Sequence, residues 1–147
     1  MAVRHIPEGH HTVTPYLIVP GVDRVIAFLE QAFDARAGER MTDPNGRIQH
    51  VEVRIGDSVI MMGEPNEKFP AMPSMIYLYV PDTDAAYQRA VQAGGTSLME
   101  PADQFYGDRN AGVRGPSGNI WWIGTHVEDV SPEEMERRAQ ARAHQNA

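Results

Sequence analysis

The spacing of hydrophobic residues changes along the chain, and each change marks a predicted element. Residues 14–19 are apolar or β-branched and are followed by Pro20 and Gly21, a pattern typical of a strand. A helix is predicted next, because apolar side chains recur every three or four residues at Val22, Val25, Ile26, Leu29 and Phe33. Three extended segments separated by turn-forming residues follow at residues 37–41, 47–55 and 58–62. The first half of the chain is therefore predicted to fold in the order βαβββ.

The second half shows the same order. Residues 75–80 form a predicted strand, and Thr83 is expected to cap a helix that stops at Gly94 and Gly95. The apolar side of this helix is formed by Ala86, Tyr87, Ala90 and Val91. Further strands are predicted at residues 96–99, 111–114 and 119–124, with the polar segment 102–110 after the first of them.

An internal repeat supports this interpretation, because the chain matches itself without a gap when Tyr16 is aligned with Tyr77. Residues of the first unit that recur in the second are Tyr16, Leu17, Val19, Pro20, Asp23, Gln31 and Ala32, matched by Tyr77, Leu78, Val80, Pro81, Asp84, Gln92 and Ala93. In the same alignment GDSVIMMGE, residues 56–64, lies over SGNIWWIGT, residues 117–125. We therefore predict one α+β domain, residues 1–147, made of module one at about 12–64, a linker at 65–73 and module two at about 74–125.

The last part of the chain predicts a separate helix. Ser131, Pro132 and Glu134 form a capping box with proline at the first helical position, which predicts a helix over about residues 131–144. Few apolar residues occur along it, so we expect it to be solvated or to pack on a partner rather than to build a site.

Charge and composition narrow the classes of function. Thirteen Lys and Arg against twenty Asp and Glu give a net charge of -7, so no basic field is available to hold nucleic acid or anionic lipids. No stretch is apolar and long enough to span a membrane or to resemble a signal segment. The absence of cysteine fits a reducing compartment. We expect a cytoplasmic protein with neither nucleic acid nor membrane as partner.

Two βαβββ units in tandem, with the segments YLIVPGVDRVIAFLEQAF, VRIGDSVIMMGE and FYGDRNAGVRGPSGNIWWIGTHVEDVSPEE, resemble the vicinal oxygen chelate superfamily of glyoxalases, bleomycin-resistance proteins and dioxygenases. Within it the chain is most similar to the PhnB-like branch, over roughly residues 12–134. The resemblance implies curved mixed sheets with helices on the convex sides and a small-molecule pocket on the concave side. It does not imply one function, because this scaffold serves lyases, isomerases, dioxygenases, transferases and drug-sequestering proteins alike.

The resemblance also implies where a metal ion would bind. In metal-dependent members a His or Glu on the first and last strand of each module supplies the ligands, and these positions fall on Thr14, Met61, Met75 and Trp122. Neither a thioether nor an indole suits Zn²⁺, Mg²⁺, Mn²⁺ or Fe²⁺, so we expect neither a metal ion nor another cofactor. The four side chains are still expected to converge on one cavity.

Alternation along the strands adds aromatic side chains to this face. Tyr16, Tyr77 and Tyr79 are expected beside the four positions, which favours a flat or apolar organic ligand held by stacking and sulfur contacts. The competing interpretation is that the methionines and Trp122 fill the space and leave no cavity.

Histidines supply the candidates for acid–base chemistry. His50 and Glu52 alternate with valines on the predicted strand 47–55, although the same alternation is typical of a solvated face. His126, past the last strand, is the second titrating candidate. His10 and its neighbour His11 are interpreted as part of an exposed polar terminus.

Three residues before the final hairpin are candidates for ligand contact. Arg109 and Arg114 could hold a carboxylate or phosphate of the ligand, and Tyr106 could act as a lid. Pairing of Asp108 with either arginine, purely to brace the loop, is the alternative.

Three functions stay open from the sequence. The first is a metal-independent protein that sequesters or carries an apolar or aromatic compound. The second is a glyoxalase-related lyase, isomerase or transferase that uses His50 and Glu52, and the third is an emptied scaffold with a structural role. A homodimer is expected, because open sheet edges give each module a reason to pair.

Metal addition gives a direct test of the ligand positions. Micromolar Ni²⁺, Zn²⁺ or Mn²⁺ should leave the melting temperature nearly unchanged, because only a ligand that binds the native state raises stability. Differential scanning fluorimetry with and without chelator measures this. A rise of several degrees would show that other residues bind metal.

Overall fold

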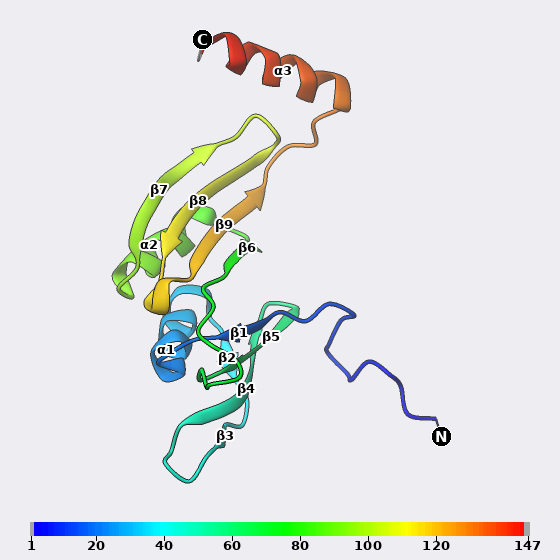
Figure 1. The fold of residues 1–147 in the computed structure, drawn as a ribbon. Coiled ribbons are helices and arrows are strands. Elements are labelled where there is room, and N and C mark those ends of the chain that lie inside the picture. The colour runs from blue at the N-terminus through cyan, green and yellow to red at the C-terminus, as the bar shows by residue number, and fades with distance from the viewer. Residues whose placement is uncertain (1, 146–147) are drawn as a thin grey trace.

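The computed structural model describes residues 2–145 and contains two sheets, each with its own helix (Figure 1). Module one runs through β1 (Tyr16–Ile18), α1 (Val22–Phe33), β2 (Arg36–Ala37), β3 (Met41–Thr42), β4 (Ile48–Ile55) and β5 (Ser58–Gly63). Module two runs through β6 (Met75–Tyr79), α2 (Thr83–Gln92), β7 (Thr96–Asp103), β8 (Asp108–Arg114), the 3₁₀ turn η1 (Pro116–Gly118) and β9 (Ile120–His126). Helix α3 (Pro132–Gln145) follows and projects beyond the second sheet (Figure 1). The predicted α+β architecture of two tandem units is confirmed.

Both sheets have the same strand order, which makes the sequence repeat a structural one. The first sheet runs β1-β5-β4-β2, with β3 also on β4, and the second runs β6-β9-β8-β7. In each sheet the first strand pairs in parallel with the last strand of its module. Tyr16 lies opposite Met61, and Tyr77 lies opposite Trp122. The sequence repeat aligns the members of these two pairs with each other, so the register of pairing is repeated as well.

The core lies on the helix side of each sheet. On β4 and β5 the side chains of Val51, Val53, Ile60 and Met62 are buried against the helices. On β8 and β9 the equivalent side chains are Ala111, Val113, Trp121 and Ile123. This alternation is the period of two expected of strands with one buried face.

Helix α1 packs against both modules. It packs on α2 and reaches the second sheet, where the ring of Phe33 lies 6.0 Å from the Trp121 ring, between centroids. Phe33 also meets Phe28 edge to face at 6.0 Å. The N-terminus of α1 is held from the far end of the module: the Glu64 carboxylate accepts hydrogen bonds from the backbone N–H groups of Gly21, at 2.8 Å, and Val22, at 3.3 Å. A carboxylate at this position complements the helix dipole.

Local differences from the predicted elements have identifiable causes. The strand expected at 37–41 is two short strands, β2 and β3, each paired with β4. Asp82 caps α2, accepting from the Ala85 N–H at 3.1 Å, so the assignment of the cap to Thr83 was wrong. Thr83 is buried instead and its hydroxyl hydrogen-bonds the Arg109 carbonyl and the Thr125 hydroxyl. Much of the polar segment 102–110 is strand, in β7 and β8.

The end of the chain agrees with its capping box. The Glu134 N–H donates to the Ser131 hydroxyl at 3.2 Å, and α3 begins at the following proline. No described residue of α3 is buried, and its main anchor is Arg138, which binds Glu128 and the Phe105 carbonyl. Among residues 2–145 no helix is long and apolar enough to cross a membrane.

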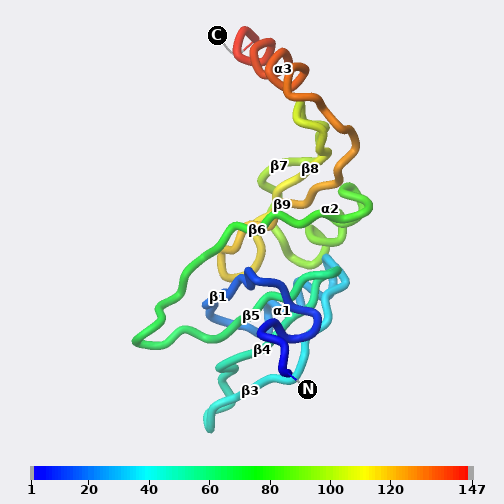
Figure 2. Tube along the Cα trace, turned by 90° about the vertical axis from the view of Figure 1, so that its right-hand side faces the viewer, coloured from blue at the N-terminus to red at the C-terminus, as the bar shows by residue number. Residues whose placement is uncertain are grey.

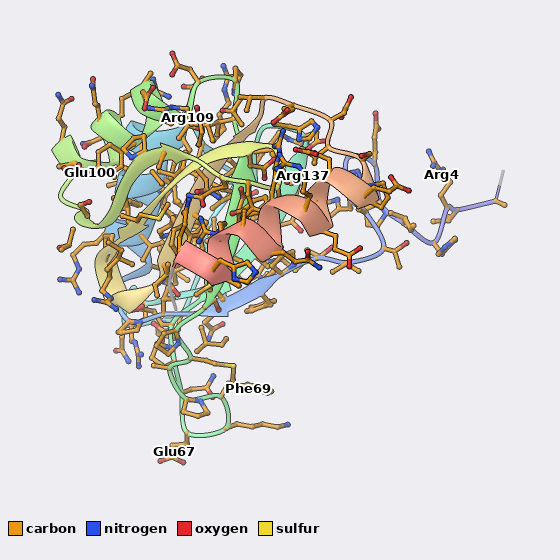
Figure 3. The ribbon with its side chains drawn as sticks, turned by 90° about the horizontal axis from the view of Figure 1, so that it is seen from above. Arg4, Glu67, Phe69, Glu100, Arg109 and Arg137 are labelled. Carbon is orange, nitrogen blue, oxygen red and sulfur yellow. The ribbon has the colours of Figure 1, made fainter. Side chains whose placement is uncertain are left out.

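The contact between the modules can be tested by truncating Phe33. Phe33→Ala removes a buried ring that touches both α1 and the second sheet, and should lower the free energy of unfolding by about 3–5 kcal/mol. Chemical denaturation measures this. Phe69→Ala is the control, since Phe69 lies exposed on the loop between the modules (Figure 3), and should change stability by less than about 0.5 kcal/mol. A small loss in Phe33→Ala would contradict the packing described.

Candidate functional site

The face of the second sheet that points away from α2 carries most of the exposed aromatic side chains of module two. Alternate residues of β6, β8 and β9 lie on it, namely Met75, Tyr77, Tyr79, Asp108, Asn110, Trp122 and His126. Met75 is 62% exposed and Tyr79 is 67% exposed, and they lie at the two ends of β6, the edge strand of this sheet. We call this surface the open face of the second sheet.

A buried carboxylate organises the open face. Asp108 is 5% exposed, and its Oδ2 accepts hydrogen bonds from the hydroxyls of Tyr77, at 2.7 Å, and Tyr79, at 2.9 Å. Its Oδ1 lies 3.1 Å from Nδ1 of His126. The other ring nitrogen of His126, Nε2, lies 2.7 Å from Oδ1 of Asp129. The imidazole therefore lies between two carboxylates.

Asn110 extends this network to a third tyrosine. Its amide Nδ2 donates to the Tyr77 hydroxyl at 3.1 Å and to the Tyr106 hydroxyl at 2.7 Å. Asn110 is 3% exposed, and its Oδ1 has no hydrogen-bond partner among the described residues. Buried polar atoms are usually satisfied, so an unpaired oxygen here is a feature to explain.

The network separates the pKa values of its members. Burial alone raises the pKa of Asp108, but hydrogen bonds from Tyr77, His126 and Tyr79 outweigh it, and the pKa lies below the ordinary aspartate value. Hydrogen bonds to Asp129 and then Asp108 raise the pKa of His126. Burial raises the pKa of Tyr77, and the hydrogen bond to Asp108 raises that of Tyr79. Both phenols therefore stay protonated while the carboxylate stays ionised.

Glycines allow the aromatic rings to lie flat across neighbouring strands. A Cβ atom on Gly124 would lie 2.5 Å from the Tyr77 hydroxyl oxygen, and one on Gly112 would lie 2.6 Å from the Trp122 ring. Any side chain at these positions would displace a ring. Tyr77 and Tyr79 lie 5.1 Å apart between ring centroids and are tilted by 49°.

The first sheet carries an equivalent but smaller unit. The Tyr16 hydroxyl lies 3.1 Å from Nδ1 of His50, and a Cβ atom on Gly63 would lie 3.3 Å from that hydroxyl. The sequence repeat aligns this tyrosine and this glycine with Tyr77 and Gly124. His50 occupies the place that Asn110 has in the second sheet. Among the described residues, module one has no counterpart of Asp108 in this unit.

Glu52 does not share a hydrogen bond with His50. Its Oε2 lies 3.0 Å from Nε2 of His10, whose side chain is only 13% exposed. The N-terminal segment thus lies against the face of the first sheet that carries Glu52 and points away from α1. In Figure 2 the dark blue chain passes β1 and β4 there. The interpretation of His10 as part of an exposed terminus was wrong, while His11 is exposed as expected. An acid–base role for His50 and Glu52 stays a prediction.

The two arginines expected to touch ligand lie elsewhere. Arg109 is on the helix side of β8, where its guanidinium binds Asp84 of α2, at 3.0 Å, and Asp103, at 3.2 Å (Figure 3). This is a bracing role, with partners other than the expected Asp108. Arg114 lines a separate groove of about 470 Å³ beside α1, together with Arg24.

The four positions implied for metal binding do not share a sheet. Met61 is on β5 of the first sheet, while Met75 and Trp122 are on the second, and the Thr14 hydroxyl donates to the His11 carbonyl. Their donors are one hydroxyl, two thioethers and an indole, which do not fit a divalent ion. Within residues 2–145 no group of three or more His, Asp or Glu is arranged to hold one. Their convergence on one cavity stays a prediction.

A crevice between the modules reaches the edge of the open face. Its volume is about 440 Å³, and it is lined by Val13, Pro15, Val59, Ile60 and Tyr77 among others. The lining is mostly apolar, as in sites for small organic molecules.

The chain belongs to the glyoxalase/bleomycin resistance protein/dioxygenase superfamily, whose model matches residues 9–123. An uncharacterized protein of Mycobacterium bovis is 33% identical, over 84% of this chain and 89% of its own length. An uncharacterized protein of Mycobacterium tuberculosis is also 33% identical, over 84% of this chain and 79% of its own length. The names of these relatives assign no activity.

Solved structures agree on the fold. TioX from Micromonospora sp. ML1 matches 82% of this chain and 100% of its own, at a TM-score of 0.65 and 20% identity. A glyoxalase-related enzyme from Fulvimarina pelagi matches 83% of this chain and 93% of its own, at a TM-score of 0.65 and 16% identity. At such identities the likeness concerns the fold alone.

Sequence reasoning missed three members of the network: Asp108 as its centre, Asn110 and Asp129. The hairpin β8–β9 sets Asp108 opposite His126 and Asn110 opposite Gly124. Counting back from the turn at residues 115–119 would have placed Asp108 beside His126. No signal of this kind exists for Asp129, because it lies in irregular chain after β9.

The charge state of His126 can be tested by titration. Its pKa should lie above the ordinary histidine value of about 6.5, and Asp129→Asn should lower it. Because the folded-state pKa is the higher one, its contribution to stability is full below about pH 6.5 and is lost as pH rises through the folded-state pKa. NMR titration of the imidazole, with Glu133→Gln as control, measures this. A pKa at or below the ordinary value would contradict the geometry.

Proposed function

We propose that this protein binds a small organic molecule without a metal ion, on the open face of the second sheet, and carries or sequesters it. One observation carries the proposal: a buried, ionised Asp108 holds two tyrosine hydroxyls in place on a face whose aromatic rings are left exposed. Burying a carboxylate costs stability unless hydrogen bonds compensate it. Apolar residues in place of Asp108 would avoid the cost of burying a carboxylate. The presence of Asp108 beneath exposed rings therefore favours a role in binding.

The composition of the face indicates the kind of ligand. Tyr77, Tyr79 and Trp122 offer ring faces and edges, and Met75 offers an adaptable thioether. Such surfaces suit a molecule with a flat apolar part. The tyrosine hydroxyls give it polar contacts that fix its orientation.

An enzymatic role is the second candidate, and one observation supports it. His126 lies between Asp108 and Asp129, so it could hold a proton near the open face. This favours His126 over the pair His50 and Glu52 for a lyase, isomerase or transferase, since Glu52 is bound to His10. An emptied scaffold has less support, because exposed rings over a fixed polar network leave a surface to bind.

A homodimer is proposed as the form that completes the site. Tyr16 and Met41 leave apolar surface exposed on the first sheet, as Met75 and Tyr79 do on the second. A two-fold arrangement could set the first sheet of one copy against the second sheet of the other and bury both. Light scattering at micromolar concentration should give the dimer mass, and a monomer mass would reject the arrangement.

Two further proposals are based on the amino-acid sequence. The PhnB-like branch is supported by the segments FYGDR and GPSGNIWW, and a cytoplasmic location by the absence of cysteine. Neither affects the chemistry of the site.

Ligand binding should survive chelation. In a thermal-shift screen of organic compounds with EDTA present, a ligand at 100 times its Kd should stabilise the fold by about 2.7 kcal/mol. Tyr79→Ala should weaken that ligand up to about tenfold by removing one stacking ring, with little loss of stability. Tyr87→Ala, on the α2 side, is the control and should leave affinity unchanged. Loss of the stabilisation on adding EDTA would show that a metal takes part.

A further inference from the structure

We infer that the open face of the second sheet selects organic cations, specifically protonated amines attached to a flat apolar frame. This rests on the proposed binding function and adds the charge and the hydrogen-bonding pattern of the ligand. The juxtaposition that carries it is the carboxylate of Asp108 directly beneath the hydroxyls of Tyr77 and Tyr79.

The first step is the position of the phenol protons. An ionised carboxylate can only accept, so Tyr77 and Tyr79 must both direct their protons to Oδ2 of Asp108. Their oxygens then present lone pairs and no proton to anything bound on the face. Tyr79 accepts no hydrogen bond from any described residue, and its oxygen is open to a ligand.

The orientation of the Asn110 amide follows from these protons. The Tyr77 oxygen has already given its proton to Asp108, so it can only accept, and Asn110 must turn Nδ2 toward it. This leaves Oδ1 of Asn110 buried and, among the described residues, without a donor. Asn110 Oδ1 is thus a buried acceptor without a donor, and the Tyr79 oxygen is an exposed acceptor that a ligand can reach.

The electrostatic field at the open face of the second sheet also favours a cationic ligand. Asp108 and Asp129 carry two negative charges, and the imidazole between them, His126, offsets one of these charges only when it is protonated. The neighbouring cations are already bound, Arg109 by Asp84 and Asp103, and Arg138 by Glu128 and Glu134. The ring faces of the tyrosines add the negative side of their quadrupoles. A cation with N–H donors matches the charge, the ring faces and the exposed acceptor oxygen of Tyr79 together.

The Tyr106 hydroxyl supplies a contrasting contact. It accepts from Asn110 at 2.7 Å, so its own proton points away from that amide. Among residues 2–145 no acceptor for it is present, and it can donate to an oxygen on the ligand. Tyr106 thus distinguishes the two ends of a bound molecule.

Three probes of one shape separate charge from stacking: tryptamine, its neutral analogue indole-3-ethanol and the anion indole-3-acetate. Isothermal titration calorimetry at low salt measures their affinities. Tryptamine should bind at least about tenfold more tightly than the alcohol, and the anion should bind most weakly. Added salt should reduce the difference.

Two variants tie this preference to the network. Asp108→Asn removes the charge and should reduce the preference for tryptamine over the alcohol to about twofold or less. At about pH 6, where its raised pKa keeps His126 protonated, His126→Gln removes the competing cation and should increase the preference, whereas a purely structural role of His126 would weaken all three probes alike. Asp103→Asn is the control, because it removes one negative charge at the end of β7, beside Arg109 on the helix side of the sheet, and should leave the preference unchanged.

The outcomes separate this inference from the proposed function. Equal affinity for the three probes, or a preference for the anion, overturns the inference and leaves small-molecule binding standing. Binding of none of the three overturns both. If Asp108→Asn does not fold, His126→Gln alone tests the inference. An unchanged or smaller preference for tryptamine over the alcohol in that variant contradicts the selection of cations by this face.

Discussion

Each βαβββ unit has a single helix, and one helix can cover only one face of its sheet. The two helices also pack on each other, so the covered faces share one core that includes Phe33 and Trp121. The opposite faces are left without a helix, and on the second sheet exposed Met75 and Tyr79 lie there beside buried Asp108 and Asn110. What the protein can bind therefore depends on which residues occupy alternate positions of β6, β8 and β9.

At these positions a single ionised group controls the remaining polar atoms. Asp108 fixes the phenol protons of Tyr77 and Tyr79, and through Tyr77 it fixes the amide of Asn110. His126 lies 3.1 Å from the other carboxylate oxygen and holds it in place. Such preorganised networks keep their geometry when a ligand arrives, because no donor has to turn to meet it. The matching unit at Tyr16 and His50 lacks the carboxylate, so the two halves of the repeat are chemically different despite their common fold.

The fold could be predicted largely from the sequence, because strand and helix periodicities recur in the same order in both halves of the chain. The aromatic members of the site were predicted for the same reason. Contacts between distant segments were not: the pair of His10 with Glu52 joins the N-terminal segment to β4, through residues with no regular period. Thr83 was mistaken for a cap because local propensity favoured it, whereas tertiary hydrogen bonds to β8 and β9 determine its place.

The most direct measurement of this account is the ionisation of Asp108 in the folded protein. Carbon NMR of its side-chain carboxyl should show one titration only below the ordinary aspartate pKa of about 3.9, with the carboxylate present throughout the neutral range. In Tyr77→Phe the pKa should rise, because one hydrogen bond to the carboxylate is lost. An Asp108 that titrates well above the ordinary value would be a hydrogen-bond donor at moderate acidity, and the fixed acceptor pattern of the open face would be contradicted.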